Sequence, residues 1–287
     1  MKIEIDKYLT VAQDNRISQT AYAQNKEDDL TIYQKCLILL AIARVQKDDQ
    51  KFKIEKITFK EFMDIMNITV GGNTERKIAE CVQTLIKKSF VVKESVGKET
   101  TLFWVNPNAT RIDWAEKVIF IQLNEKLEKY FLNLDGHFTS FQLGFVTNFT
   151  GKYSFKVYEY LHSYLGLGKL IVKREDALKI LGNGHYHHIA DFDRYVLKKA
   201  VNEINEYSDI IVKYYRRIDR KTITHYFFTI SKKDQDDIET IQEKWSNHKS
   251  EYDEIAEDFA KFSHLYQETN EMYFQEENKN IYESEIL

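Results

Sequence analysis

Histidine and tyrosine residues follow one another closely in the sequence between residues 185 and 199. His185, Tyr186 and His187 precede Tyr195 and Lys199. Two neutral imidazoles could hold a divalent metal ion, and a tyrosine hydroxyl could attack a phosphodiester to form a phosphotyrosine link. The spacing is unfavourable, because the histidines follow Gly-Asn-Gly in a connector and leave little chain to fold the tyrosine over a metal. Such short patterns also arise easily by chance.

The same region contains a second pattern, "DFDRYVLKKAVNEINE" over residues 191–206. Apolar residues recur at every fourth position, which places Phe192, Val196, Ala200 and Ile204 on one face of a helix. The opposite face carries Arg194, Tyr195, Lys198, Lys199 and Asn202. Arginine and lysine can reach guanine O6 and N7 in the major groove of DNA, and asparagine can pair with adenine. An ordinary solvated helix surface carries the same kinds of charge. The helix alone therefore does not decide between DNA binding and a solvated surface without a ligand.

The charge of the chain is divided unevenly along its length. The formal net charge is −4, yet residues 234–287 hold 16 acidic and 4 basic side chains. Residues 150–233 carry 16 lysines and arginines against 9 acidic residues. A basic segment of this kind suits a polyanion, and the acidic tail after it could compete for the same surface.

The first half of the chain contains an opening helix followed by the order helix, turn, helix, hairpin. We expect helices over 30–46, 57–68 and 74–89, and strands over 90–96 and 101–105. Thr58 followed by Glu61 is typical of a capping box at a helix start. Gly71 and Gly72 allow positive φ and predict a turn before the last helix. This order is the pattern of a winged helix.

The second half repeats the order without repeating the residues. We expect helices over 151–166, 174–181 and 191–206, then a hairpin over 209–230. Residues 118–134 predict a strand and a helix between the halves. The fold class is therefore α+β, with two tandem winged-helix domains and a C-terminal acidic tail. The expected domains are 1–135, 136–233 and a partly helical or disordered tail over 234–287.

Basic side chains cluster in the second hairpin, beside the basic helix. They are Lys213, Arg216, Arg217, Arg220 and Lys221, which suit DNA phosphates. The matching set in the first half is thinner and is diluted by Glu75 and Glu80: Thr74, Arg76, Lys77, Lys87 and Lys88. The hairpin aromatics are interpreted as sheet core rather than as base-stacking platforms: Tyr214, Tyr215, Tyr226, Phe227 and Phe228.

Several function classes find no support in the sequence. No run of about 18 apolar residues predicts a membrane span, and the first residues lack the apolar run of a signal peptide. Cys36 and Cys81 are far apart, which favours reduced thiols in a cytoplasmic protein over a disulfide framework. No GxxxxGK[ST] or GxGxxG motif is present. We therefore expect no cofactor, no bound metal, no membrane partner and no enzymatic activity.

Three segments resemble one family, the replication initiators of theta-replicating plasmids with directly repeated origin sites (iterons). The segments are "FTSFQLGFVTNFTGKYSFKVYEYLHSY", "DFDRYVLKKAVNEINEYSDIIVKYYRR" and "ITHYFFTI". The matching elements are Phe138-Thr139, Lys152-Tyr153, Val157-Tyr158-Glu159 and Val196 through Asn205. The resemblance covers about residues 1–233, and Glu203-Ile204-Asn205 is its most specific block. Relatives often have an acidic-proline pair where this chain has Lys198 and Lys199, so contacts there cannot be copied.

The resemblance implies a protein that binds double-stranded DNA at iterons and recruits the host initiator and the replicative helicase. It also implies a homodimer in equilibrium with a monomer, where the dimer represses its own gene and so takes part in plasmid copy control. Each winged helix would place a helix in a major groove. Two alternatives stay open. One is a two-domain winged-helix transcriptional repressor. The other is a rolling-circle nicking enzyme built on His185, His187 and Tyr195.

Overall fold

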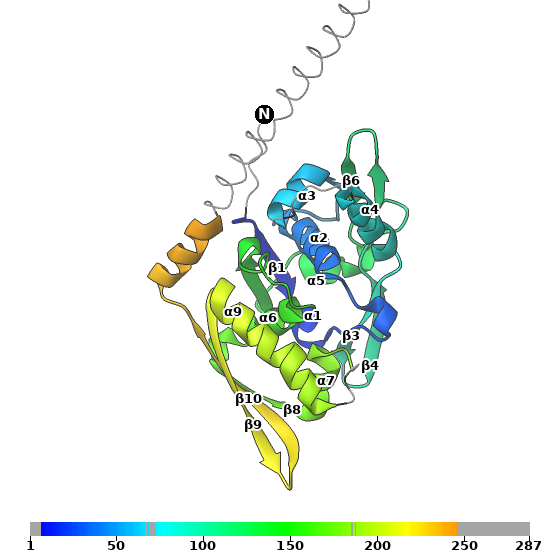
Figure 1. Cartoon of the computed structure of the whole chain (residues 1–287). Helices are drawn as coiled ribbons and strands as arrows, with labels where there is room; N and C mark the ends of the chain where they lie inside the picture. The colour runs from blue at the N-terminus through cyan, green and yellow to red at the C-terminus, as the bar shows by residue number, and fades with distance from the viewer. Residues whose placement is uncertain (1–6, 67, 69–72, 185, 187, 246–287) are drawn as a thin grey trace, which may run out of the picture. The chain divides into compact units, whose positions relative to one another are not determined.

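The computed structural model describes residues 7–66, 68, 73–184, 186 and 188–245. The described residues up to Glu239 belong to one compact unit (Figure 1). Of the predicted acidic tail, residues 235–245 are helical, and the remainder lies outside the described residues. The predicted glycine turn at Gly71 and Gly72 also lies outside them.

The first half folds in the predicted order around one nearly fully buried helix. Its elements are α2 (Ile32–Ala43), β2 (Glu55–Thr58), α3 (Phe59–Ile65), α4 (Thr74–Leu85), β3 (Ser89–Ser95) and β4 (Lys98–Phe103). Residues Cys36 to Leu40 of α2 are all 0 % exposed. A helix that is apolar on every side must lie inside the core, which explains its run of apolar residues.

The predicted capping box forms only in part. The Thr58 side chain accepts a hydrogen bond from the Glu61 backbone N–H at 3.0 Å, as an N-cap should. The Glu61 carboxylate does not return the bond but pairs with Arg44 instead. The reciprocal box occurs at the start of α2, where Thr31 and Gln34 bond each other's backbone N–H groups. Ile57, expected at the helix start, belongs instead to strand β2, which ends at Thr58.

Two further sheets complete the first half. β6 (Val118–Ile121) lies between β2 and β5 (Arg111–Asp113), antiparallel to both, and η2 (Glu125–Leu127) and α5 (Glu128–Phe131) follow it. β1 (Thr10–Asp14) pairs antiparallel with β7 (Phe138–Gln142). The β1–β7 pair was not expected. It joins the first strand of the described residues to a segment assigned to the second domain, and the boundary at 135/136 stays a prediction.

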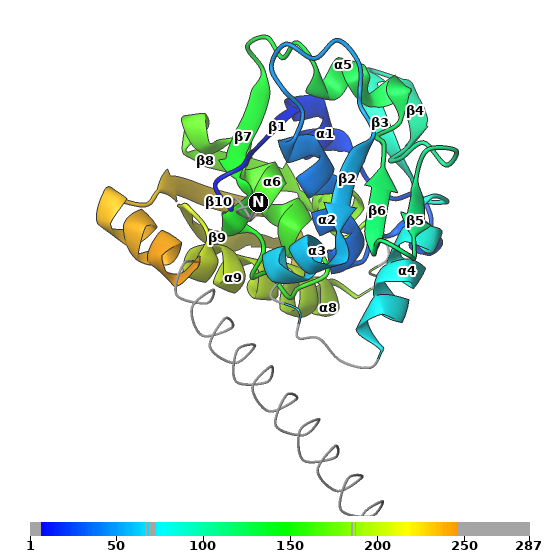
Figure 2. The ribbon, with the colours of Figure 1, turned by 90° about the horizontal axis from the view of Figure 1, so that it is seen from above.

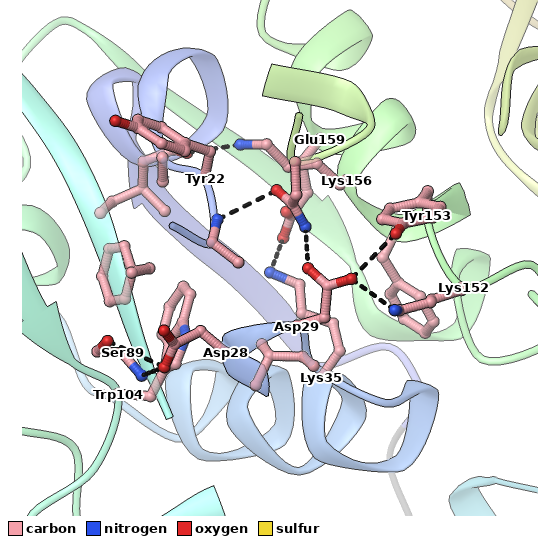
Figure 3. Close-up of a pocket in the computed structure, with 17 residues that line it drawn as sticks. Tyr22, Asp28, Asp29, Lys35, Ser89, Trp104, Lys152, Tyr153, Lys156 and Glu159 are labelled. Atoms are coloured by element: carbon pink, nitrogen blue, oxygen red, sulfur yellow. Dashed lines mark hydrogen bonds and ion pairs between the residues drawn. The ribbon is translucent and has the colours of Figure 1, made fainter. Parts of the chain in front are cut away.

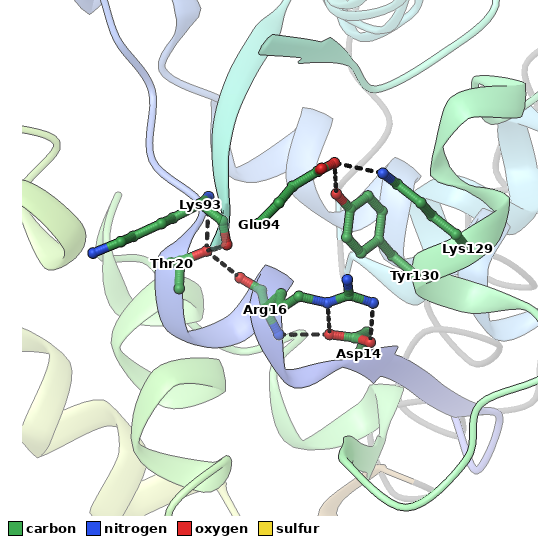
Figure 4. Close-up of polar contacts among 7 residues, drawn as sticks. All are labelled: Asp14, Arg16, Thr20, Lys93, Glu94, Lys129 and Tyr130. Carbon is green, nitrogen blue, oxygen red and sulfur yellow. Dashed lines mark hydrogen bonds and ion pairs between the residues drawn. The ribbon is translucent and has the colours of Figure 1, made fainter. Parts of the chain in front are cut away.

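A polar network fastens the β3–β4 hairpin to the start of the chain (Figure 4). Asp14 caps α1 (Asn15–Thr20) and accepts two further hydrogen bonds from the Arg16 guanidinium at 2.9 and 2.8 Å. That guanidinium lies over the Tyr130 ring, and the Tyr130 hydroxyl donates to Glu94 of β3 at 3.0 Å. Hydrogen bonds from Lys129, Lys98 and Tyr130 lower the pKa of Glu94 to about 2.

The second half forms the predicted second winged helix. Its elements are α6 (Ser154–His162), β8 (Lys169–Lys173), α7 (Arg174–Leu181), α8 (Ile189–Asp191), η5 (Phe192–Lys198), α9 (Lys199–Tyr207), β9 (Ile210–Asp219) and β10 (Thr222–Lys232). β10 lies between β8 and β9 and is antiparallel to both. Strand β8 was not expected. Figure 1 shows the β9–β10 hairpin as a long ribbon that extends away from α9.

Polar side chains hold the two halves together around a small cavity of about 80 Å³ (Figure 3). Asp29, which is 5 % exposed, accepts hydrogen bonds from Lys152 at 2.5 Å, Tyr153 at 3.0 Å and Asn183 at 2.5 Å. Burial, together with the Asp29 carboxylate, raises the pKa of Tyr153. The contacts link the loop before α2 to α6 and to the connector after α7.

Two more lysines face this junction. Lys35 of α2 pairs with the buried Glu159 of α6 at 2.9 Å. Lys156 of α6 donates to the carbonyl oxygens of Ile17 and Ser18 at 3.1 and 2.9 Å. The pKa of Lys156 is lowered to about 7, mainly because the amine is buried away from water; Glu159 opposes the shift and Lys35 adds to it.

The lowered pKa of Lys156 predicts a pH dependence of stability. The unfolded chain keeps an amine pKa near 10.5, so between about pH 7 and pH 10 the unfolded state binds more protons than the folded state. The stability contributed at this site therefore rises with pH. We expect the free energy of unfolding of the natural chain, minus that of Lys156→Met, to increase over this range in urea titrations. A difference that stays constant with pH would contradict the assignment.

Candidate nucleic-acid interface

The helix of residues 189–207 buries the predicted apolar face. Phe192, Val196, Ala200 and Ile204 are all at most 1 % exposed. A strict four-residue repeat would drift by about 40° per step around an α-helix. Segment η5 is π-helical, and its wider turns offset that drift. The unusual repeat in the sequence therefore matches an unusual helix.

The predicted reading side chains all lie on the exposed face of this helix. They are Arg194, Tyr195, Lys198, Lys199 and Asn202. The Arg194 guanidinium lies 5.3 Å from the centre of the Tyr195 ring, and Tyr195 is 55 % exposed. The Lys199 ammonium instead pairs with the Glu203 carboxylate, one turn further along the helix, at 2.7 Å. Arg194, Lys198 and Asn202 thus stand together at the surface, with Tyr195 beside them, while Lys199 is engaged by its own helix.

Glu203 anchors the helix to the start of α6. Its carboxylate is 4 % exposed and accepts hydrogen bonds from the Thr150 hydroxyl at 2.6 Å and from the Gly151 backbone N–H at 3.1 Å. Burial would raise the pKa of Glu203, but hydrogen bonds from Lys199, Thr150 and Gly151 outweigh it and lower the pKa. A Cβ at Gly151 would clash with the Ser154 hydroxyl oxygen and lie 3.0 Å from the Glu203 carboxylate, so a larger residue here would force these side chains to move.

Asn205 anchors the same helix to strand β9. Its side-chain amide donates to the Val212 carbonyl at 2.9 Å and accepts from the Val212 N–H at 2.7 Å. Ile204, between Glu203 and Asn205 in the sequence, is 0 % exposed. The Glu203-Ile204-Asn205 block is therefore structural, and it holds the exposed face in place without being part of it.

Asp193 joins the helix to the hairpin, a role that no signal in the sequence indicated. Its carboxylate accepts hydrogen bonds from Arg216 at 2.5 Å and from the Tyr226 hydroxyl at 2.8 Å. Arg216 had been assigned to a phosphate, but its guanidinium contacts Asp193 and is only half exposed. The phosphate role of Arg216 stays a prediction, and the structure adds a role in the fold.

The other basic residues of the hairpin are exposed: Lys213, Arg217, Arg220 and Lys221. Arg220 and Lys221 form the two-residue turn with φ of 45° and 71°. Such a turn normally carries Asn-Gly, because other residues are strained at positive φ. The turn thus places two exposed cations at the tip of the hairpin.

The candidates of the first half do not form one cluster. Arg76 and Lys77 are exposed near the start of α4, and Arg76 pairs with Glu80 at 3.5 Å. Thr74 is half-buried. Lys87 and Lys88 follow the other end of the helix, about 15–20 Å away by the α-helical rise. Lys88 donates to the Glu27 carbonyl.

The hairpin aromatics divide between the two faces of the sheet. Tyr226 and Phe228 are buried at 0 and 1 % exposure, as a core assignment requires, and Tyr214 is half-buried. Tyr215 is 60 % exposed, so the prediction was wrong for this residue. The partly exposed Phe227 ring stacks on Tyr215.

The structure describes only some of the residues on which the metal-and-tyrosine interpretation depends. His185 and His187 lie outside the described residues, and Tyr195 is exposed on the helix. Among the described residues, no group of three His, Cys, Asp or Glu side chains is placed to hold a metal ion. Within the same part of the chain, no helix has the length and apolar character needed to cross a membrane.

Comparison with known proteins gives two matches along the chain. Residues 10–162 match the model of the initiator replication protein WH1 domain, and residues 176–230 match the initiator Rep protein WH2 domain. A replication initiation protein of Escherichia coli is 23 % identical over 213 residues, which cover 70 % of this chain and 64 % of the relative. The match thus covers less than two thirds of the relative's length.

Solved structures of RctB resemble the chain at lower similarity. A selenomethionine crystal structure of its domains 2 and 3 has a TM-score of 0.43 and 12 % identity, covering 72 % of this chain and 82 % of that one. A second structure of these domains has a TM-score of 0.39 and 11 % identity, and the match covers 72 % of this chain and 83 % of that one.

The fold defines a protein with two tandem winged-helix domains, the second of which presents a basic helix beside a basic hairpin. The chain belongs to the initiator replication protein family, through both its WH1 and its WH2 domain.

Replacing Arg216 should affect stability, whereas replacing its neighbour should not. Arg216→Ala leaves the buried Asp193 carboxylate with one fewer charged donor, and we expect a loss of about 1–2 kcal/mol after allowance for solvent screening. Arg217→Ala is the matched control, since Arg217 is exposed on the same strand. Thermal unfolding of both variants tests this. Equal midpoints would show that the Arg216–Asp193 pair does not stabilise the fold.

Relief of the strained turn should separate stability from DNA binding. The double change Arg220→Asn and Lys221→Gly supplies the residues that such a turn prefers, so we expect stability to rise by about 1–2 kcal/mol. Loss of two cations should weaken DNA binding and flatten its salt dependence. Urea unfolding and binding to a duplex across a salt series measure the two effects. Unchanged DNA affinity at low salt would remove both residues from the interface.

Proposed function

We propose that the chain is a plasmid replication initiator that binds directly repeated origin sequences. The observation that carries the proposal is the helix of residues 189–207, whose exposed Arg194, Lys198 and Asn202 stand beside a basic hairpin. Arginine, lysine and asparagine are the side chains that read base edges in the major groove. The family membership supports DNA as the ligand.

Both winged helices would take part in the same complex. In Figure 2, α4 and the second helix, α8 to α9, lie along the same edge of the compact unit. A groove of about 830 Å³ is lined by Lys77 and Thr84 of α4 and by Thr150, the residue that Glu203 holds. Consecutive major grooves on one side of DNA lie about 34–36 Å apart. One chain would therefore cover about two helical turns of a directly repeated site.

The remaining features of the proposal come from the family resemblance. The bound protein would recruit the host initiator and the replicative helicase without chemistry of its own, in the cytoplasm. A homodimer in equilibrium with the monomer would repress the chain's own gene and so limit plasmid copy number. No metal or cofactor takes part in this scheme.

Footprinting on the origin region of its plasmid, with and without divalent metal, tests the function. Protection of tandem direct repeats of about two helical turns each, with no strand cut, is the expected result. Protection of a single inverted repeat would instead favour a transcriptional repressor. Metal-dependent nicking with protein attached to a 5′ end would overturn the proposal and point to Tyr195.

Replacing Arg194 tests the base-reading assignment. Arg194→Ala should weaken binding to the protected repeat by about 1–3 kcal/mol and relax specificity at one base pair. Lys221→Ala is a matched control, because Lys221 lies in the hairpin turn as a proposed phosphate contact, and loss of a phosphate contact weakens binding to every sequence alike. Competition with a set of single-base variants of the repeat measures both. A uniform loss with Arg194→Ala would show that Arg194 holds a phosphate.

A further inference from the structure

The outward face of the β8–β10–β9 sheet carries a row of apolar side chains. Phe227 of β10 pairs with Ile171 of β8 on one side and with Tyr215 of β9 on the other. Ile171 is 61 % and Tyr215 is 60 % exposed. The rings of Tyr215 and Phe227 are nearly parallel, at 6°, with centres 5.0 Å apart. The two rings are therefore stacked, so that each covers one face of the other. With Ile171 they form a continuous apolar row at the surface, which we call the aromatic row.

Cationic side chains border the aromatic row on both sides. The pairing places Lys173, His225 and Arg217 along one border, and Lys169, Thr229 and Lys213 along the other. The lysines and the arginine of these borders are exposed. No acidic residue stands at an outward position of these strands in the described residues 169–173, 211–217 and 225–231.

This face is distinct from the one that carries the basic helix. Neighbouring residues in a strand point to opposite sides of the sheet. Tyr226, next to Phe227, is buried, and its ring packs against Phe192 of the helix at 5.8 Å. The helix therefore covers the inner face, and the aromatic row lies across the sheet from it.

The arrangement selects for unpaired bases. An exposed aromatic ring offers a stacking surface to any base, and bordering cations attract the phosphates that join the bases. In a duplex the faces of the bases are already stacked on one another, so they cannot lie on a protein ring. Single strands offer both their base faces and their phosphates.

We propose that the outward face of the β8–β10–β9 sheet is a second nucleic-acid site, which binds a single strand by stacking a base on the exposed Tyr215 ring, backed by Phe227, between two cationic borders. The site goes beyond duplex recognition and does not depend on it. An initiator that holds one strand on this face could bind the duplex with its helix at the same time.

The test measures single-strand and duplex binding with the same full-length variants. Labelled oligothymidylate and oligouridylate of about 15 nucleotides are the single-strand probes, and a random-sequence duplex is the reference. Tyr215→Ala should weaken oligothymidylate binding about tenfold, given about 1–3 kcal/mol per stacked base. Tyr215→Phe keeps the ring and should bind as the natural chain does. Duplex affinity should be unchanged in both.

Two results would overturn the proposal. One is absence of oligothymidylate and oligouridylate binding by the natural chain at low salt. The other is equal single-strand affinity in Tyr215→Ala and the natural chain. Comparison of the two oligonucleotides shows whether the site prefers DNA or RNA. Arg194→Ala is the converse control, because failure of duplex recognition there leaves single-strand binding intact.

Discussion

The hydrogen bonds that converge on Asp29 fix how the two winged helices relate to each other. A buried carboxylate requires partners for its oxygens, and Lys152, Tyr153 and Asn183 all come from the second half of the chain. The Lys35–Glu159 pair and the β1–β7 ladder add contacts across the same junction. If both halves contact one DNA site, as proposed, this junction sets the distance between their reading helices.

A second group of carboxylates fixes the orientation of the basic helix itself. Glu203 holds it to the residues before α6, and Asp193 holds it to the hairpin through Arg216 and Tyr226. The exposed cations can then occupy defined positions before DNA arrives, which reduces the ordering cost of binding. This explains why the most specific family block, around Glu203, contains residues that do not reach the surface.

The sequence was sufficient to predict the order of elements, because that order depends on local patterns. The four-residue repeat from Phe192 to Ile204 located the basic helix, and two β-rich runs joined by a short turn located the hairpin. Strands β1 and β7 were missed, since they are short and pair across more than 100 positions with no connecting turn. Strand β8 was missed because five residues give too little alternation for assignment.

The sequence predicted which residues of the candidate site are exposed on the helix. It did not predict the buried residues that hold this helix in place. Charge and helical spacing were enough to place Arg194, Lys198 and Asn202 on one face. The pairing of Arg216 with Asp193 depends on the approach of two distant segments, which no residue pattern encodes. Adjacent Tyr214 and Tyr215 had to face opposite sides of a strand, but only the register across the sheet shows which one is outward.

The spacing of the two reading helices is the most direct test of a junction held by Asp29. Gel-shift affinities would be compared for the protected repeat and for repeats with about 5 or about 10 base pairs inserted at the centre, half a helical turn and one full turn. A fixed junction predicts that both insertions reduce the affinity to that of one half of the repeat. Recovery of the affinity with the full-turn insertion, or equal affinity for all three repeats, would contradict a fixed junction.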